Sequence, residues 1–146
     1  MSIRTLLHKK DNTVLHISAE ATLKACAAFL CEKRVGALVV MDDKGEVAGI
    51  VSERDLVRSL NCHSGDCLNY KVRDVMTPRE KLITATPADE LEDVMAQITD
   101  HHVRHIPIFE DNKLVALVSI GDVVKMLLDM VKSENEYMRE YITGAR

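Results

Sequence analysis

The sequence predicts a mixed α/β fold, of the α+β kind, built from two copies of one strand–helix–strand–strand–helix unit. The first observation is a self-match between residues 51–57 and residues 118–124, which lie 67 positions apart. Both segments run from an apolar stretch through Ser-x-x-Asp into a second apolar stretch. The second observation is that each half alternates short apolar runs with segments of helical periodicity. A duplicated supersecondary unit explains both observations.

The similarity between the halves extends well upstream of the Ser-x-x-Asp steps. The offset is 68 before the turn at Gly45 and 67 after it, because the second copy is one residue shorter there. A unit of roughly 60 residues is marginal alone, so we expect the two copies to share an interface. The matched pairs are Leu23 with Leu91, Val35 with Val103, Asp43 with Asp111, Val51 with Val118, Ser52 with Ser119, Asp55 with Asp122 and Val57 with Val124.

Each element of the first copy, residues 1–62, follows from a local pattern. Ser18 is a suitable N-cap for a helix whose apolar residues recur at helical spacing. A continuous apolar run at residues 37–41 has the length of a buried strand, and Ser52 opens a second helix. In order we expect a loop at 1–13, a strand at 14–17, a helix with Leu23, Ala27 and Leu30 on one face, strands at 37–41 and 47–51 around a turn at 42–45, and a helix at 52–60.

The second copy, residues 72–130, follows a polar linker at residues 63–71. Residues 86–89 offer Thr as an N-cap, Pro at the first helical position and Asp at the third, which predicts a helix start. The expected elements are a helix with Leu91, Val94, Met95 and Ile98 on one face, strands at 103–109 and 114–118 around a turn at 110–113, and a helix from Ser119 that carries Val123, Val124 and Leu127.

A charged tail at residues 131–146 closes the chain. Its apolar and aromatic residues recur at helical spacing among the charges, and Gly144 suits the end of a helix. We expect a helix that packs either on the module or on a partner subunit.

Composition excludes several classes of function. The chain of 146 residues is 47% hydrophobic and 29% charged, which is typical of a globular domain. A net charge of −4 and an aromatic content of 3% without Trp argue against a nucleic-acid partner. No apolar run approaches the ~20 residues that span a bilayer, so we expect no membrane association. The first residues lack the apolar core of a signal peptide, and we expect a cytoplasmic protein.

Two groups of cysteine and histidine residues could in principle bind a metal. Cys62 and Cys67 flank a loop with His63 and Asp66, but no second ligand pair accompanies them. The residues 101–105 carry three histidines, of which two are expected at a helix end and one on a strand. We therefore predict no metal site, while a thiol or metal redox role for Cys62 and Cys67 remains an alternative. Cys26, on an apolar helical stretch, is expected in the core.

The Ser-x-x-Asp step has two interpretations. The structural interpretation is a capping box at the start of a helix, which is a common motif. The functional interpretation is a ligand site, because free N–H groups and the helix dipole favour an anion at a helix N-terminus. A Ser hydroxyl there can donate to phosphate, and an Asp can accept both hydroxyls of a ribose. Duplication alone does not decide between the two interpretations.

The sequence resembles a tandem pair of CBS domains, named after cystathionine beta-synthase, of the small stand-alone bacterial type. The resemblance rests on the duplicated unit with Ser-x-x-Asp at the end of its last strand, and it covers nearly the whole chain. Val72-x-Asp74-Val75-Met76-Thr77 resembles the segment that introduces such a repeat. Arg104-His105-Ile106-Pro107-Ile108 resembles its Arg-His-apolar-Pro-apolar strand.

The resemblance implies two CBS repeats packed around a pseudo-twofold axis, with clefts that bind adenine nucleotides. AMP is the leading ligand, and ADP, ATP, NAD(H) or S-adenosylmethionine are others found in the family. The resemblance also implies a homodimer and a non-catalytic regulatory role toward a partner protein that the sequence does not name. Ligand would act by population shift between two arrangements of the repeats.

The implied site residues fall into two clefts. In the family the Asp holds the ribose, the Ser approaches the phosphate, and basic residues on the Arg-His strand contact phosphate. One cleft would use Ser119, Asp122, Arg104 and His105, with Val35, Gly36 and Ala37 near the base. The other would use Ser52, Arg54 and Asp55, with Val103, Arg104 and His105 nearby.

The two implied clefts differ in their side chains. Gly121 stands where the first copy has Arg54, while Gly36 and Ala37 stand where the second copy has Arg104 and His105. We therefore expect the two sites to prefer different ligands.

Two further classes of function remain open. One is a structural or oligomerisation module in which Ser-x-x-Asp is only a cap. The other is the thiol or metal redox protein. We do not expect an enzyme, since the chain contains no nucleophile elbow, P-loop or Rossmann glycine fingerprint. Some CBS pairs occur inside inosine-monophosphate dehydrogenases, but 146 residues leave no room for that enzyme's barrel.

Overall fold

The computed structural model describes residues 1–62 and 66–144, and it consists of two compact units. The Asp55 unit comprises Thr13–Thr84, and the Asp122 unit comprises Met1–Asn12 together with Ala85–Arg146. These units differ from the two sequence copies in one respect: the leading segment of each copy packs with the rest of the other copy. Residues 72–84 pack with the first Ser-x-x-Asp step, and residues 1–12 pack with the second. The repeat boundaries expected from the sequence stay a prediction. The mixed α/β class is confirmed.

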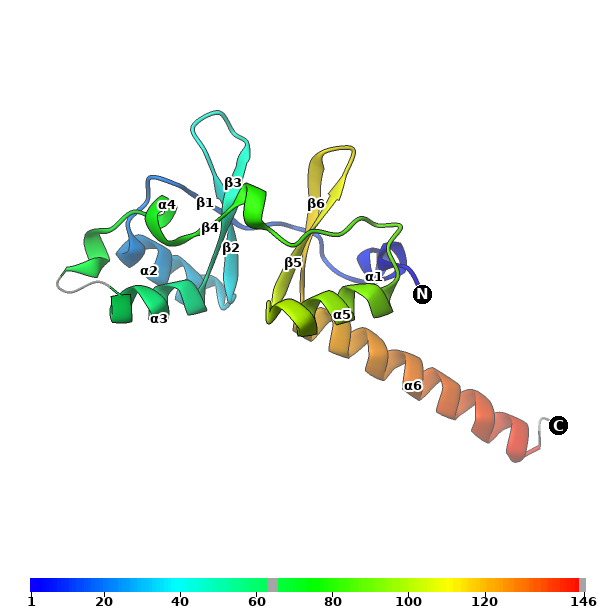
Figure 1. Ribbon diagram of the computed structural model, residues 1–146. Coiled ribbons are helices and arrows are strands. Elements are labelled where there is room, and N and C mark those ends of the chain that lie inside the picture. Colours follow the sequence, from blue (N-terminus) through cyan, green and yellow to red (C-terminus); the bar gives the residue numbers. More distant parts are fainter. Residues whose placement is uncertain (63–65, 145–146) are drawn as a thin grey trace. The chain divides into compact units, whose positions relative to one another are not determined.

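The Asp55 unit is built on a four-stranded sheet in the order β1-β2-β3-β4 (Figure 1). β1 and β2 are parallel, and the other two pairs are antiparallel. Leu38, Val40 and Val51 are fully buried against Leu23 and Cys26 of the first long helix, which forms the core of the unit. The elements are β1 His16–Ser18, α2 Leu23–Lys33, β2 Ala37–Met41, β3 Val47–Ser52, α3 Glu53–Cys62, the 3₁₀ turn η1 Cys67–Asn69, α4 Val72–Val75, β4 Thr77–Pro78 and the 3₁₀ turn η2 Arg79–Lys81.

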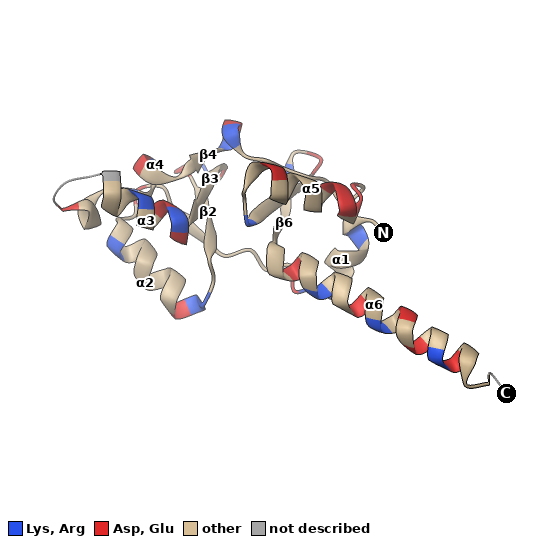
Figure 2. Ribbon diagram, turned by 60° about the horizontal axis from the view of Figure 1, so that its bottom comes forward, with Lys and Arg blue, Asp and Glu red and all other residues tan. Residues whose placement is uncertain are grey.

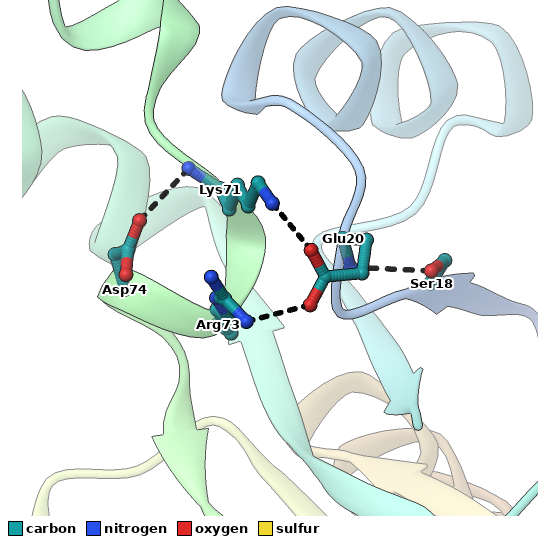
Figure 3. Close-up of polar contacts among 5 residues, drawn as sticks. All are labelled: Ser18, Glu20, Lys71, Arg73 and Asp74. Carbon is teal, nitrogen blue, oxygen red and sulfur yellow. Dashed lines mark hydrogen bonds and ion pairs between the residues drawn. The ribbon is translucent and has the colours of Figure 1, made fainter. Parts of the chain in front are cut away.

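Polar contacts attach α4 to the turn between β1 and α2 (Figure 3). Glu20 accepts hydrogen bonds from Lys71 Nζ at 2.5 Å and from an Arg73 guanidinium nitrogen at 2.8 Å. The Lys71 bond, with the Arg73 charge beside it, lowers the pKa of Glu20. The backbone N–H of Val72 also donates to the carbonyl of Ala21 at 2.8 Å. The segment that introduces the second sequence copy is therefore part of the Asp55 unit.

The Asp122 unit carries the two-stranded antiparallel sheet β5-β6 and three helices. Ile106, Ile108 and Val118 of the sheet are fully buried, as are Ile3 of the first helix and Leu91. Figure 1 shows α6 continuing past α5 and α1 to the C-terminus. The elements are α1 Ile3–Lys9, α5 Leu91–His101, β5 His105–Glu110, β6 Lys113–Ser119 and α6 Ile120–Ile142.

The structure corrects the expectation of a loop at residues 1–13. Ile3–Lys9 form α1, whose Ile3, Leu6 and Leu7 are buried in the Asp122 unit. Residues 10–13 lie outside any helix or strand, as expected. The helix α1 is short and amphipathic, and its apolar face is buried because residues from Ala85 onward pack against it.

Two expected helix starts are also wrong. Thr22, not Ser18, caps α2, and its side chain accepts from the backbone N–H of Ala25. The helix α5 starts at Leu91, since Asp89 instead accepts from the backbone N–H of Thr86 at 2.8 Å and closes a turn before the helix. Ser, Thr and Asp near a helix start favour turns as well as caps, and this ambiguity explains both errors.

The expected tail helix is the second half of one 23-residue helix, α6, rather than a separate element. The expectation that it packs on its own module is wrong for its last turns, where Tyr141 and Ile142 are 73% and 74% exposed. Packing on a partner subunit stays a prediction.

Candidate ligand-binding sites

Asp55 lies at the junction of β3 and α3, where the strand ends at Ser52 and the helix begins at Glu53. Its Oδ2 atom accepts from the backbone N–H of Ser52 at 2.8 Å and from the Ser52 hydroxyl at 3.2 Å. The backbone N–H of Glu53 donates to the carbonyl of Gly36 at 3.0 Å. The start of the helix is thus fixed to the segment that enters β2.

The carboxylate of Asp55 is unfavourably placed for a charge. Asp55 is only 9% exposed, and this burial raises the pKa of its carboxyl group. The hydrogen bonds from Ser52 and the charges of Arg58 and Arg54 act to lower the pKa, but burial outweighs them. Ionised Asp55 therefore costs the folded protein free energy at neutral pH. A ligand that donates hydrogen bonds to this carboxylate would recover part of that cost.

Val35, Gly36 and Ala37 lie beside this same junction. Ala37 pairs with Ser52 in the antiparallel ladder between β2 and β3. Val35 lines a hollow of about 460 Å³ between α2 and α3, together with Leu30 and Leu56. These three residues belong to the Asp55 unit, so their expected role toward Asp122 joins residues of different units and stays a prediction.

Asp122 occupies the matching junction of β6 and α6 and makes a complete capping box. Its Oδ2 atom accepts from the backbone N–H of Ser119 at 2.9 Å, and its own N–H donates to the Ser119 hydroxyl at 3.1 Å. Lys10 adds a further contact to this carboxylate. The Lys10 Nζ atom lies 3.2 Å from Asp122 Oδ2 and donates to the carbonyl of Leu117 at 2.8 Å.

The pKa of Asp122 is shifted in the opposite direction to that of Asp55. Burial acts to raise the pKa of Asp122, but the hydrogen bond from the Ser119 backbone and the charge and hydrogen bond of Lys10 outweigh it, so the pKa is lowered. Ionised Asp122 therefore stabilises the folded protein at neutral pH.

The Arg-His strand lies next to Asp122 in the same unit. His105 pairs with Ser119 across the β5–β6 ladder, and the carbonyl of Arg104 accepts from the backbone N–H of Ile120 at 2.8 Å. Arg104 is exposed, whereas Val103 and His105 are half-buried. The structure thus places the backbone of Arg104 and His105 beside Ser119 and Ile120. The roles of their side chains toward Asp122 and a ligand stay a prediction.

The Asp-to-backbone bond is not itself a mark of a ligand site. Asp74 accepts from the N–H of Lys71, and Asp89 accepts from that of Thr86, with the same three-residue spacing. What distinguishes Asp55 and Asp122 is a Ser hydroxyl beside the carboxylate and a position between a core strand and a long helix. Asp74 and Asp89 are therefore matched controls, one in each unit.

Lys10 is the site residue that sequence reasoning missed. It sits in a polar run that predicts a loop, and 112 positions separate it from Asp122. The sequence signal that could have identified Lys10 was its position in the segment that leads into the first copy of the duplicated unit.

Replacing Lys10 with methionine is expected to raise the pKa of Asp122 and to lower the free energy of unfolding by about 1–3 kcal/mol, because a charge-assisted hydrogen bond is lost. Carboxyl-carbon NMR titration of Asp122 and urea unfolding measure the two effects. Lys9→Met, at an exposed neighbouring position, is the control. An unchanged Asp122 titration in Lys10→Met would contradict this assignment.

The other candidate residues do not assemble a site in the described parts of the chain. Among the side chains that the structure describes, which exclude those of residues 62–65, no group of three or more His, Cys, Asp or Glu is placed to hold a metal ion. The loop between Cys62 and Cys67 includes residues 63–65, so that hypothesis lies largely outside the described residues. Cys26 is buried in the core as expected, and burial, with the nearby Asp55 charge, raises its pKa to about 11. No helix among the described residues is long and apolar enough to cross a membrane.

A duplicated strand–helix junction with Ser-x-x-Asp at each copy defines a class of tandem-repeat module, and the family comparison agrees. The family model described as CBS domain matches residues 10–61 and residues 72–129. The chain therefore belongs to the CBS domain family, which confirms the resemblance noted in its sequence.

Relatives and solved structures support the same assignment. The chain is 34% identical over 136 residues to the mitochondrial CBS domain-containing protein CBSX3 of Arabidopsis thaliana, covering 92% of this chain and 66% of that protein. It therefore spans slightly less than two thirds of that relative's length. The crystal structure of the CBS-domain containing protein ATU1752 from Agrobacterium tumefaciens matches with a TM-score of 0.80 and 31% identity, covering 85% of this chain and 91% of that one.

A more distant structure carries ligands. The CBS domain pair of protein MJ0100, crystallised in complex with 5-methylthioadenosine and S-adenosyl-L-methionine, matches with a TM-score of 0.74, covering 89% of this chain and 98% of that one. At 16% identity this likeness shows a shared fold only.

Proposed function

We propose that this protein is a non-catalytic sensor that binds adenosine-containing ligands at its two Ser-x-x-Asp junctions and changes conformation or assembly when they bind. The observation that carries the proposal is Asp55, a carboxylate buried at a helix start with a raised pKa. Such an arrangement is costly for a mere cap and suits a carboxylate whose partners arrive with a ligand.

The roles follow the chemistry of a nucleoside. Both hydrogen bonds from Ser52 go to Oδ2 of Asp55. Oδ1 would accept hydrogen bonds from the ribose hydroxyls. The hydroxyl of Ser52 and the guanidinium of Arg54 would meet phosphate or another anionic substituent. Val103, Arg104 and His105 are proposed to complete this cleft.

At the second junction, Asp122 would hold the ribose, and Ser119, Arg104 and His105 would meet the anionic part of the ligand. Val35, Gly36 and Ala37 are proposed to lie near the base. Lys10 already occupies Asp122 Oδ2 and holds the carboxylate ionised. The two sites therefore differ in charge before ligand arrives, which supports different ligand preferences.

The ligand class is an adenosine derivative. AMP is the leading candidate, and ATP, ADP, NAD(H), S-adenosylmethionine and 5-methylthioadenosine are the others. The last two bind the structural relative named above. We further propose that the protein acts as a homodimer that regulates another protein, through the shift of population that ligand binding brings about.

A thermal-shift screen of these ligands tests the proposal. A ligand present at about 100 times its Kd adds about 2.7 kcal/mol to the free energy of unfolding. For a chain of 146 residues this corresponds to a rise in Tm of roughly 5–11 °C. Absence of a shift with every ligand, from protein verified to be free of bound nucleotide, would contradict the proposal and leave both Ser-x-x-Asp steps as helix caps.

A further inference from the structure

The helix α6 carries a stripe of exposed apolar side chains beyond its first two turns. Leu128, Val131 and Met138 are 56%, 53% and 55% exposed, and Ile142 is 74% exposed. Exposure of several large apolar groups along one helix marks an interaction surface. The stripe is distinct from the face that joins α6 to its own unit, where Val123 and Met126 are buried and the helix contacts α1, α5 and β6.

The spacing of the stripe is that of a coiled-coil seam. With Asn135 included, steps of four and three residues alternate from Val124 to Ile142. This is the heptad pattern, with apolar residues at its a and d positions, rather than the wider stripe of a helix that packs on a globular core. The a positions are Leu128, Asn135 and Ile142, and the d positions are Val124, Val131 and Met138.

Asn135 is the polar member of the seam. A single Asn at an a position favours a parallel two-stranded pairing, because each Asn then faces its equivalent and can form a hydrogen bond with it. In an antiparallel pair the same Asn would face an apolar d residue and leave its amide unsatisfied. Asn135 thus selects both the orientation and the register.

The flanking charges fit the same arrangement. Glu134 occupies a g position, and Arg139 occupies the e position five residues later. In a parallel pair these two residues meet across the seam, twice by symmetry. Figure 2 shows acidic and basic residues interspersed along α6 rather than gathered by sign, so the two copies would not repel each other.

We propose that residues 124–142 of α6 pair with the same segment of a second copy as a parallel two-stranded coiled coil centred on Asn135. The segment is short for an isolated coiled coil. Its N-terminal turns are, however, already held in helical form by the Asp122 unit, which reduces the ordering cost of pairing. The inference rests on the homodimer of the proposed function, for which it names the surface and orientation, and it does not depend on any ligand.

Sedimentation of the full ligand-free chain tests the seam. Wild-type protein is expected to sediment as a dimer, and Met138→Glu is expected to weaken self-association at least tenfold. Tyr137→Glu is the matched control, since Tyr137 is a neighbouring exposed residue at an outward c position, and it is expected to leave the dimer intact. Glu134→Arg and Arg139→Glu should each weaken the dimer, and the double variant should restore it.

Oxidative cross-linking tests the orientation. Asn135→Cys is expected to form an intermolecular disulfide, mapped by mass spectrometry, at least ten times faster than Glu136→Cys, whose side chain points outward from the seam. A monomeric wild-type chain would overturn both the homodimer and this inference. A dimer that survives Met138→Glu, or that links Glu136→Cys as fast as Asn135→Cys, would overturn this inference alone.

Discussion

Replacing Asp55 with asparagine is expected to stabilise the protein at pH 7 by about 0.5–2 kcal/mol, the usual gain from a single stabilising substitution. The buried Asp55 carboxylate has a raised pKa, so its ionised form is disfavoured in the fold. Asparagine keeps an oxygen to accept from the Ser52 N–H and carries no charge. The same change should weaken ligand binding at this site about 10- to 100-fold, because hydrogen bonds to a charged acceptor are lost.

The stabilisation by Asp55→Asn should depend on pH in a definite direction. The folded pKa lies above the unfolded value, so the cost of ionisation is complete above the folded pKa and vanishes below the unfolded value of about 3.9. Urea unfolding of wild type and variant at a series of pH values measures the difference between them, which should shrink as the solution is acidified. A variant less stable than wild type at pH 7 would contradict this account of Asp55.

Asp122→Asn is expected to show the opposite sign. The folded pKa of Asp122 is lowered, so its contribution to stability is complete above the unfolded pKa and is lost as the pH falls through the folded pKa. The variant should be less stable than wild type at pH 7 and should approach it in acid. Destabilisation of equal size at both Asp positions would mean that both are simple caps.

Gly49→Ala is expected to lower the free energy of unfolding by about 1–3 kcal/mol or more, the cost of overfilling a packed site. A Cβ atom on Gly49 would lie 2.2 Å from the carbonyl oxygen of Thr77, which is backbone held by the β3–β4 pairing. The strand β4 would have to move, and the link that attaches residues 72–78 to the Asp55 unit would weaken.

The control for Gly49→Ala is Gly121→Ala. A Cβ atom at Gly121 would meet only the Ser119 hydroxyl at 3.5 Å, an ordinary contact, and alanine favours the helix by about 0.5–1 kcal/mol. Equilibrium unfolding in urea compares the two variants. Equal stability of Gly49→Ala and wild type would show that β4 is not held against Gly49.

The sequence was sufficient to predict the elements that depend on local pattern. The apolar runs at residues 37–41 and 47–51 became β2 and β3, and both Ser-x-x-Asp steps fell at strand–helix junctions as expected. Periodicity and capping chemistry act over a few residues, so they can be identified without the fold. The family resemblance assigned His105 and Ser119 to one site, and the hairpin that joins β5 and β6 pairs them directly.

Long-range contacts were not predictable in the same way. The helix α1 and the contact of Lys10 with Asp122 depend on residues 1–12 packing with a unit that begins at Ala85. The two Asp residues also share a motif yet have pKa shifts in opposite directions, since burial dominates at Asp55, while the Ser119 hydrogen bond and Lys10 outweigh burial at Asp122. Charge environment is set by tertiary neighbours, which the motif does not record.

Calorimetric titration of the ligand identified by thermal shift tests the central claim most directly. Wild type, Asp55→Asn and Asp122→Asn are compared with Asp74→Asn and Asp89→Asn, which change the same kind of backbone acceptor away from the sites. We expect that only Asp55→Asn and Asp122→Asn lose affinity, each at one of two distinguishable sites. Wild-type affinity and stoichiometry in both Asp55→Asn and Asp122→Asn would contradict the central claim.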